Sequence, residues 1–439
     1  MNTEPERVHQ REKRIKYTTI TAILAKILAM LVPFITVRFA LGYLGEEIYG
    51  LWNAILSFFS AFAFADLGLG SGLQTALSQA QGREDKEHSR KLVASTFFVL
   101  IISTAIIMFI ILILFPMANW GDVMNAESDD ARELAGVVVI IIVTSKLLNI
   151  PFSLVNRTQL ALQEGYKGNL WQCAANVISI VLIIFVVLTD TGKISLIMVS
   201  TYSVVIVSVL NFIVYFSFQR KEYAPHIKYA DSKMAKGMLK IGISFCMLSI
   251  VTNFGLSLDN FIVAKVSSLA ESTTYSILYR AAGLISVGCG MLSAPLWGAF
   301  GEALERKDYE WVKIRCKKTA MLSLIMALIA TLVLMVLGNI LFTVWLGQKL
   351  EYSQFMLFGM CLLQGLVSFI SPFFMVLNAR GIVKKQILVY SIYTLVSVLL
   401  KCILGKLIGI EWIPMIGSVC YGLLIVPYVY QTARKEIKN

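Results

Sequence analysis

Seven ionisable side chains lie within stretches of this 439-residue chain that are otherwise apolar enough to cross a membrane. Five are cations and two are carboxylates: Lys26, Arg38, Asp66, Lys146, Asp259, Arg280 and Lys401. A charge at the centre of a bilayer costs roughly 2.5–3.5 kcal/mol on insertion scales, so such side chains usually face a wet cavity or a partner. The seven residues therefore predict a polar path through the membrane, with surplus positive charge along it.

The elements that hold these charges are predicted membrane-spanning helices. The chain is 57% hydrophobic and only 15% charged, a balance unlike that of a soluble protein. A spanning helix needs about 20 mainly apolar residues. Twelve segments qualify, at approximately 18–41, 49–77, 92–115, 134–156, 169–189, 194–217, 241–265, 274–301, 319–346, 352–378, 387–410 and 412–430. The first is too long for a signal-peptide core and has no small-residue cleavage site, so we expect it to remain as a span.

The basic residues follow the positive-inside rule if both chain ends lie in the cytoplasm. With this topology, 29 of the 39 Lys and Arg residues fall in inner segments, five in outer loops and five within spans. Cytoplasmic loops of membrane proteins carry such an excess. The net charge of +12 therefore reflects topology and contact with anionic membrane lipid, and we expect no nucleic-acid partner. The prediction is a multi-pass protein of the inner (plasma) membrane with both termini cytoplasmic.

The longest inner connection predicts two halves. It covers residues 218–240 and follows the sixth span, which makes 1–217 an N-terminal six-helix bundle and 241–439 a C-terminal one. Because each half has an even number of spans, both would start on the inner side, and a duplication would be parallel. The predicted fold is thus all-α, with twelve transmembrane helices in two parallel six-helix bundles.

Two local features support a duplication. A shift of 223 residues places Arg83 and Asp85 on Arg306 and Asp308, each in the inner loop after the second span of its half. The same shift brings the glycine-rich DLGLGSG of the second predicted span near VGCGMLSAP of the eighth. Interrupted spans at corresponding positions can mark a transport site, although small residues also simply allow helices to pack closely.

Depth along the helices indicates which charges could meet. Lys26 and Asp66 lie at similar depth on consecutive spans, so they could form a neutralised pair, or Lys26 could line a cavity with Asp66 as its switchable partner. Asp259 lies six residues from the outer end of its span, too deep for a short side chain to reach water. We expect it to pair with Arg280 or Arg38. Asp66 and Asp259 are therefore candidates for charge pairing or coupling.

The remaining cations are candidates for binding cargo. Lys146 has no acidic neighbour at its depth and is the best candidate for a cavity cation, joined by Arg38, Lys26 and Arg280. Arg38 could instead snorkel to the interface, or grip a phosphate through two hydrogen bonds. Lys401 is ambiguous, because its stem could reach the outer interface. Five cations against two acids favour an anionic cargo.

No metal site or cofactor is expected. The seven cysteines are scattered without a CxxC pair, and most fall within spans, where cysteine is a small apolar residue. The three histidines lie in inner hydrophilic segments, which excludes a histidine proton relay inside the membrane. The sequence has no nucleophile elbow or phosphate-binding loop either, so we do not expect an enzyme.

Three segments resemble a known family. ITVRFALGYLGEEIYGLW (35–52), FADLGLGSGLQTALSQAQGRED (64–85) and LDNFIVAKVSSLAESTTYSILYRAAGL (258–284) are similar to the polysaccharide-repeat, or O-antigen type, flippases. These belong to the multidrug/oligosaccharidyl-lipid/polysaccharide (MOP) exporter superfamily. The resemblance implies two six-helix bundles around a central cavity, lined largely by spans one, two, seven and eight.

The resemblance also implies a cargo. This would be an undecaprenyl-pyrophosphate-linked oligosaccharide that crosses from the inner to the outer leaflet by alternating access. Candidate partners are a polysaccharide polymerase and chain-length machinery. Arg38, Asp66 and Asp259 fall in the motif regions, whereas Lys146, Arg280 and Lys401 rest on the physical argument alone.

Two other functions compete. A multidrug antiporter of the same superfamily would be expected to cluster carboxylates in its first half, where Asp66 is the only deep one. A membrane glycosyltransferase or polysaccharide polymerase could use Glu46 and Glu47 of the first outer loop as catalytic acids. Such enzymes usually need a long outer loop to hold an acceptor, and the largest outer loop here, about 116–133, is too short for a domain.

Overall fold

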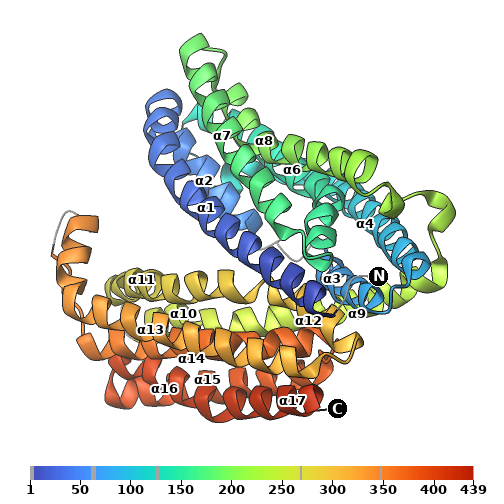
Figure 1. Cartoon of the computed structure of the whole chain (residues 1–439). Helices are drawn as coiled ribbons and strands as arrows, with labels where there is room; N and C mark the ends of the chain where they lie inside the picture. The colour runs from blue at the N-terminus through green and yellow to red at the C-terminus, as the bar shows by residue number, and fades with distance from the viewer. Residues whose placement is uncertain are drawn as a thin grey trace. The chain divides into compact units, whose positions relative to one another are not determined.

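The computed structural model describes residues 4–60, 66–124, 126, 128–266, 269–346 and 349–438, and the regular secondary structure of these residues is helical. The chain divides into two compact units, residues 1–243 and 244–439, and each is described by itself. Figure 1 shows the helices of both units coloured along the chain.

The first unit begins with a helix much longer than its predicted span. Its helices are α1 (Glu4–Leu44), α2 (Glu46–Ser60), α3 (Leu69–Gly82), α4 (Lys86–Leu114), α5 (Trp120–Val123), α6 (Asp129–Ala161), α7 (Gly165–Thr189) and α8 (Lys193–Val214), followed by a π-helical turn (Tyr215–Gln219). Helix α9 (Ser232–Ser257) begins in the first unit and ends in the second.

The second unit has the same all-helical construction. After α9 come α10 (Asp259–Val266), α11 (Leu269–Ser293), α12 (Leu296–Glu305), α13 (Tyr309–Leu346), α14 (Gln354–Ala379), α15 (Lys384–Ile408) and α16 (Ile413–Cys420). A second π-helical turn (Tyr421–Ile425) leads into α17 (Val426–Lys438).

The helices confirm a multi-pass membrane protein. Ten segments among the described residues are long and apolar enough to cross a bilayer, and they match the third to twelfth predicted spans. They are Lys86–Met117, Asp129–Ala161, Gly165–Thr189, Lys193–Gln219, Ser232–Leu256, Thr274–Glu305, Tyr309–Trp345, Gln354–Ala379, Lys384–Ile408 and Ile410–Lys438. Helices α1 and α2 cover the first predicted span and the start of the second. The number of twelve and the inward termini stay predictions.

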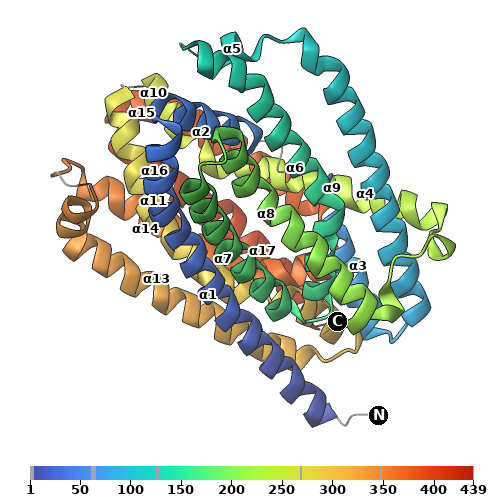
Figure 2. The ribbon, with the colours of Figure 1, turned by 90° about the horizontal axis from the view of Figure 1, so that it is seen from above.

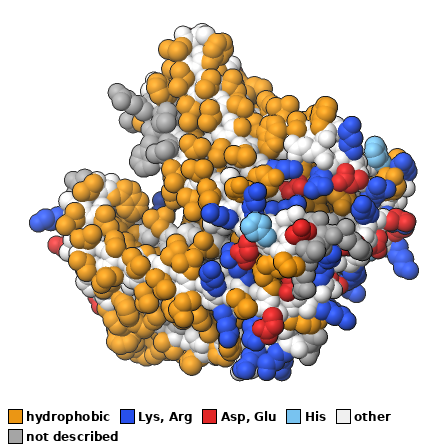
Figure 3. Space-filling view, in the orientation of Figure 1, with side chains coloured by type: hydrophobic (Ala, Val, Ile, Leu, Met, Phe, Trp, Pro, Cys, Tyr) orange, Lys and Arg blue, Asp and Glu red, His pale blue; other side chains and the backbone are white. Residues whose placement is uncertain are grey.

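Surface composition agrees with this assignment. The apolar side chains of Ile102, Phe109 and Ile113 in α4 are more than half exposed, as are those of Leu332 and others in α13. Figure 3 shows that hydrophobic side chains cover most of the visible face, whereas Lys, Arg, Asp and Glu gather at one side. Large apolar areas of this kind are stable in lipid and rare on soluble monomers.

Small and branched residues of α6 contribute to an apolar core of the first unit. Ala131, Ala135 and Val138 are fully buried and Val139 nearly so, which lets α6 pack closely against α8 and α2. Helix α7 packs along α1, as Figure 1 also shows. Between these two helices, the Asn169 amide donates to Thr18 O and Thr21 Oγ1, both at 3.0 Å.

Helix α14 has the central place in the second unit. It packs against α11, α12, α13, α16 and α17. Its buried face includes Leu357, Met360, Cys361 and Ile370, each at most 1% exposed. Helix α15 packs against α10 and α16, and Figure 2 shows α10 and α15 side by side.

Both predicted interruptions occur, each within the stretch that the sequence indicated. The second span is broken at Asp66–Gly68, where Leu67 (φ 51°) and Gly68 (φ 68°) adopt the left-handed conformation that ends regular helix. The eighth span is broken at Ala294–Pro295, between α11 and α12. Gly288 and Gly290 lie within the continuous α11, so the proline, which cannot donate to the helical ladder, causes this break.

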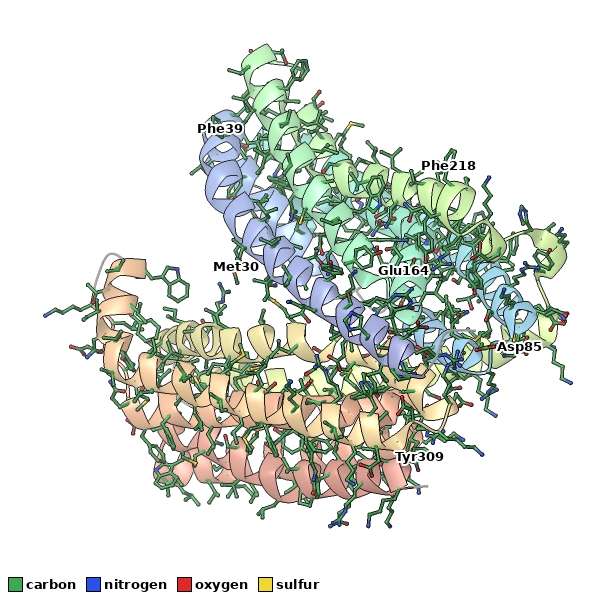
Figure 4. All side chains as sticks on the ribbon, viewed as in Figure 1. Met30, Phe39, Asp85, Glu164, Phe218 and Tyr309 are labelled. Atoms are coloured by element: carbon green, nitrogen blue, oxygen red, sulfur yellow. The ribbon has the colours of Figure 1, made fainter. Side chains whose placement is uncertain are left out.

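The shift of 223 residues recurs in backbone geometry. Arg83 N donates to Gln79 O at 3.1 Å, and Arg306 N donates to Glu302 O at 3.2 Å. The next residue of each turn is left-handed, with φ 59° at Glu84 and 62° at Lys307. Figure 4 labels Asp85 and Tyr309, which lie at these two turns. The same helix-ending motif, repeated at the same offset, supports an internal duplication.

Candidate functional site

The most deeply buried charges belong to the second unit. Asp259, at the first position of α10, is 3% exposed and Lys401, in α15, is 1% exposed. Lys401 Nζ lies 2.5 Å from Asp259 Oδ1, and the Tyr275 hydroxyl of α11 donates to Asp259 Oδ2 at 2.9 Å. One cation and one hydroxyl thus compensate both carboxylate oxygens, and the contacts join three helices.

This pair corrects one expectation and resolves an ambiguity. Asp259 was expected to pair with Arg280 or Arg38, and that was wrong. Lys401, left ambiguous by the sequence, is buried because α15 directs it inward, where the absence of a side chain at Gly417 makes room for it. A Cβ on Gly417 would lie 2.9 Å from Lys401 Cε and Nζ. A buried lysine without a carboxylate would be costly, so the two residues require each other.

Asp66 lies near a cation other than Lys26. Its Oδ1 accepts from Gly68 N at 2.9 Å. Both Asp66 and Arg157 lie beside Gly70. A Cβ built on Gly70 would lie 3.1 Å from Asp66 Oδ2 and 3.0 Å from Arg157 Nε. Arg157 also donates to Gln74 Oε1 at 3.4 Å. The turn that breaks the second span thus places Asp66 near Arg157, and of the two alternatives for Lys26 and Asp66 the neutralised pair does not form.

Three of the predicted cavity cations remain uncompensated. Lys26 of α1, Lys146 of α6 and Arg280 of α11 are exposed, and none has an ion-pair partner among the described residues. The side chain of Arg38, also in α1, lies outside the described residues. Asp259 is paired with Lys401 and Asp66 lies near Arg157, so the ionised side chains left without a neighbour of opposite charge among the predicted cavity residues that the structure describes are cations.

Next to Lys146 lies a pocket lined by carboxamides. It has a volume of about 330 Å³ between α6, α7 and α8 of the first unit. Its polar lining consists of Asn149, Asn156, Asn169, Gln172, Asn176, Ser208 and Asn211, with no charged residue among those that line it. Lys146 precedes Asn149 by three residues, so both lie on one face of α6.

A cluster of charges fixes one end of the first unit. Glu164, labelled in Figure 4, is bonded to Arg220, to Lys167 Nζ at 2.9 Å and to the Tyr215 hydroxyl at 2.9 Å. Burial raises the pKa of Glu164, but its bonds to Arg220 and Lys167 outweigh this and hold the pKa below its ordinary value. The bond to Glu164 in turn raises the pKa of Arg220. The cluster ties the start of α7 to the end of the π turn.

A larger pocket of about 650 Å³ lies at the charged end of the first unit. Its lining includes Arg83, Lys91 and Lys233 together with Asp85, Glu87 and Asp231. Lys91 pairs with Glu87 at 2.6 Å. Since the two signs balance, this pocket lacks the positive surplus that an anionic cargo needs.

Sequence reasoning missed several of these residues, although spacing could have found them. Tyr390, Tyr393, Ser397 and Lys401 recur on one face of α15, and this polar stripe indicates a buried face rather than a snorkelling lysine. Asn169, Gln172 and Asn176 likewise share one face of α7. Arg157 lies just past the predicted span 134–156, but α6 continues to Ala161 and includes it.

Comparison with known proteins identifies relatives. Residues 15–295 match the family described as polysaccharide biosynthesis protein. The chain is 21% identical over 294 residues to a Yersinia pseudotuberculosis protein named for O-antigen export, and 24% identical over 296 residues to a Salmonella typhi protein named as an O-antigen transporter. These matches cover 65% and 66% of this chain, and the chain spans 65% of the length of each relative.

Solved structures share the fold. An outward-facing multidrug resistance transporter of the MATE family, in the MOP superfamily, aligns with a TM-score of 0.79 at 15% identity, covering 98% of this chain and 96% of that one. A MOP superfamily transporter from Pyrococcus furiosus, whose binding pocket is described as reversed in polarity, aligns with a TM-score of 0.78 at 16% identity, with the same coverage.

Proposed function

The chain belongs to the polysaccharide biosynthesis protein family, and from that premise we propose that it transports an anionic, lipid-linked oligosaccharide across the cell membrane. In this proposal the cargo carries undecaprenyl pyrophosphate and moves from the inner to the outer leaflet by alternating access. The protein acts as a flippase of the inner membrane, with cytoplasmic termini, and not as an enzyme. The matched O-antigen proteins support this class of cargo.

One observation carries the proposal. Lys26, Lys146 and Arg280 are exposed on membrane helices and lack an ion-pair partner among the described residues. A pyrophosphate would supply the missing negative charge, and charge-assisted hydrogen bonds to it strengthen in surroundings of low dielectric. The prenyl chain needs no protein site, because it can stay in the lipid. Arg38 adds a fourth candidate cation on the same helix as Lys26.

The two deep acids have a different part in this proposal. Asp66 lies in the turn that interrupts the second span, near Arg157, and Asp259, paired with Lys401, directly follows the turn at Leu258 between α9 and α10. Discontinuous helices commonly form the coupling sites of transporters. We therefore assign these pairs to holding or switching the helices, and the exposed cations to the cargo. The polymerase and chain-length machinery of the same pathway are its candidate partners.

Complementation tests the proposal. In a strain lacking the gene, wild-type protein should restore surface polysaccharide, whereas Lys146→Ala should lower it at least tenfold at equal protein level in the membrane. Lys146→Arg, which keeps the charge, should retain most of the activity. The deletion strain and the alanine variant should accumulate the lipid-linked oligosaccharide on the inner leaflet. Normal surface polysaccharide in the alanine variant would contradict the proposal.

The fold favours one alternative, an ion-coupled multidrug exporter, because a multidrug transporter aligns with 98% of the chain. The two functions predict opposite cargo charges, since cationic drugs would be repelled by Lys26, Lys146 and Arg280. Raised drug resistance on expression, without any effect on surface polysaccharide, would select the exporter.

A further inference from the structure

The carboxamide-lined pocket of the first unit has unsatisfied hydrogen-bonding groups. Asn149 Oδ1 and Asn176 Nδ2, both from lining residues, are buried without a hydrogen-bond partner among the described residues. Gln159 Oε1, next to the pocket-lining Gly168, is also buried without a hydrogen-bond partner among the described residues. Leaving one such group unpaired costs about 1–3 kcal/mol. Three together indicate that something other than protein occupies this space.

Further amides hold the pocket in a fixed arrangement. Gln159 Nε2 donates to Asn211 Oδ1 at 2.9 Å, and Asn211 Nδ2 donates to Asn156 Oδ1 at 3.2 Å. Gln159 and Asn211 are at most 1% exposed. This chain of bonds ends at Asn156, whose own N–H groups have no partner among the described residues. The pocket therefore offers donors and acceptors from rigid positions.

The donors and acceptors match hydroxyl groups. A hydroxyl both donates and accepts, so a ring with several hydroxyls could satisfy Asn149 Oδ1, Asn176 Nδ2 and the Asn156 amide together. Trp171 also lines the pocket and supplies an apolar face of the kind against which a sugar ring can stack. The lining residues include no carboxylate, which disfavours a dedicated cation site.

The pocket begins close to the positive charge of Lys146. Asn149 lies one turn from the exposed Lys146 on the same face of α6, roughly 4.5 Å along the helix axis. The volume of about 330 Å³ is at the lower end of small-molecule pockets, which span about 300–1,000 Å³. It suits one sugar ring and not a whole oligosaccharide.

We infer that this pocket binds the sugar residue nearest the pyrophosphate of the cargo, while Lys146 binds the phosphate. The inference rests on the proposed function and adds a site that recognises sugar separately from charge. Asn156 and Asn176 are the residues that give this preference, since each offers N–H groups free of other partners.

Binding measurements on the full chain in lipid nanodiscs test the inference. The probes are undecaprenyl pyrophosphate and the same lipid carrying one glucose, galactose or N-acetylglucosamine. Wild-type protein should bind at least one glycosylated probe tenfold or more tighter than the bare lipid. Asn156→Leu and Asn176→Leu should each reduce this preference below threefold while leaving affinity for the bare lipid unchanged. Lys146→Ala should weaken all four probes by the same factor.

Controls separate the possible outcomes. Asn53→Leu removes an amide of the same unit whose Nδ2 is bonded to Tyr49 O at 2.9 Å within α2, and it should keep the preference. Asn156→Ser removes the amide without adding volume, so it replaces the leucine variant if that one does not fold. Equal binding of all four probes, or a preference that survives the pocket variants, would overturn the sugar site and leave the flippase proposal standing. No binding of any probe by wild-type protein would overturn both.

Discussion

Lys401 Nζ lies 2.5 Å from Asp259 Oδ1, and both side chains are almost completely removed from solvent. The two residues are far apart in sequence, on α15 and α10, and Tyr275 of α11 completes the contact. Removing one member of a buried ion pair strands the other charge, which costs about 3–5 kcal/mol, whereas replacing both with apolar residues can be nearly neutral.

The pair therefore predicts a specific stability pattern. Lys401→Met should destabilise the protein by about 3–5 kcal/mol, and the double variant Lys401→Met/Asp259→Leu should recover most of that loss. Thermal unfolding of purified protein in detergent measures both. Lys406→Met is the control and should change little, because Lys406 is an exposed lysine five residues further along α15. A Lys401→Met protein as stable as wild type would mean that this ammonium reaches water.

Gly417 should not tolerate a side chain. An alanine Cβ would lie 2.9 Å from Lys401 Nζ and Cε. The ion pair with Asp259 holds the lysine side chain in place, so it does not move away from the added methyl group. We expect Gly417→Ala to cost about 1–3 kcal/mol, as overpacking in a core does. Gly365→Ala is the matched control, because its Cβ would meet Ala327 Cβ at an ordinary 3.7 Å. Equal unfolding temperatures of the two variants would be evidence against a confined Lys401.

Replacing Arg157 or Lys146, two cations of α6, should affect stability and transport differently. Arg157→Met removes the charge beside Asp66 and the donor to the buried Gln74, so it should lower stability by about 1–3 kcal/mol. Lys146→Met removes an exposed cation without a partner among the described residues, so it should leave stability unchanged while reducing transport. Unfolding curves and surface polysaccharide, measured on both variants, distinguish the roles. The same response in both assays would show that the two cations are equivalent.

The Glu164 cluster predicts a pH-dependent contribution. Because the folded-state pKa of Glu164 lies below its ordinary value of 4.5, its stabilisation is fully present above the unfolded-state pKa and is lost as pH falls through the folded-state value. Glu164→Gln should therefore destabilise the protein by about 1–3 kcal/mol at pH 7. The difference from wild type should shrink below about pH 4.5. A difference that persists unchanged at pH 3 would show that charge is not its cause.

Much of the fold was predictable because membrane helices follow from composition. The predicted spans 134–156 and 352–378 lie inside or within two residues of α6 and α14, since long apolar stretches have no other stable form in lipid. The interruptions were harder to place. Glycine marked the break after Asp66, but in the eighth span the proline was decisive and the two glycines continued the helix.

The residues of the site were predictable only in part. Depth along the spans indicated Asp66 and Asp259 as charges that need partners, and Asp259 has one. The partners named for Asp259 were wrong, because depth says nothing about which helix lies beside which, or which way a helix face turns. Asp259 pairs with Lys401 from a helix more than a hundred residues away, and the cation near Asp66 is Arg157, which lies just past the predicted span 134–156.

The sequence by itself determined that this is a membrane protein of many helices, related to polysaccharide exporters, with more positive than negative charge in its spans. Those properties depend on residue type and spacing along one helix. Only the tertiary structure decided that Lys401 is buried, that Lys146 is exposed, and that six carboxamides from three helices line one pocket. Burial, exposure and the lining of a pocket depend on the distances between helices. These distances result from the packing of several helices together and cannot be read from the sequence of one helix.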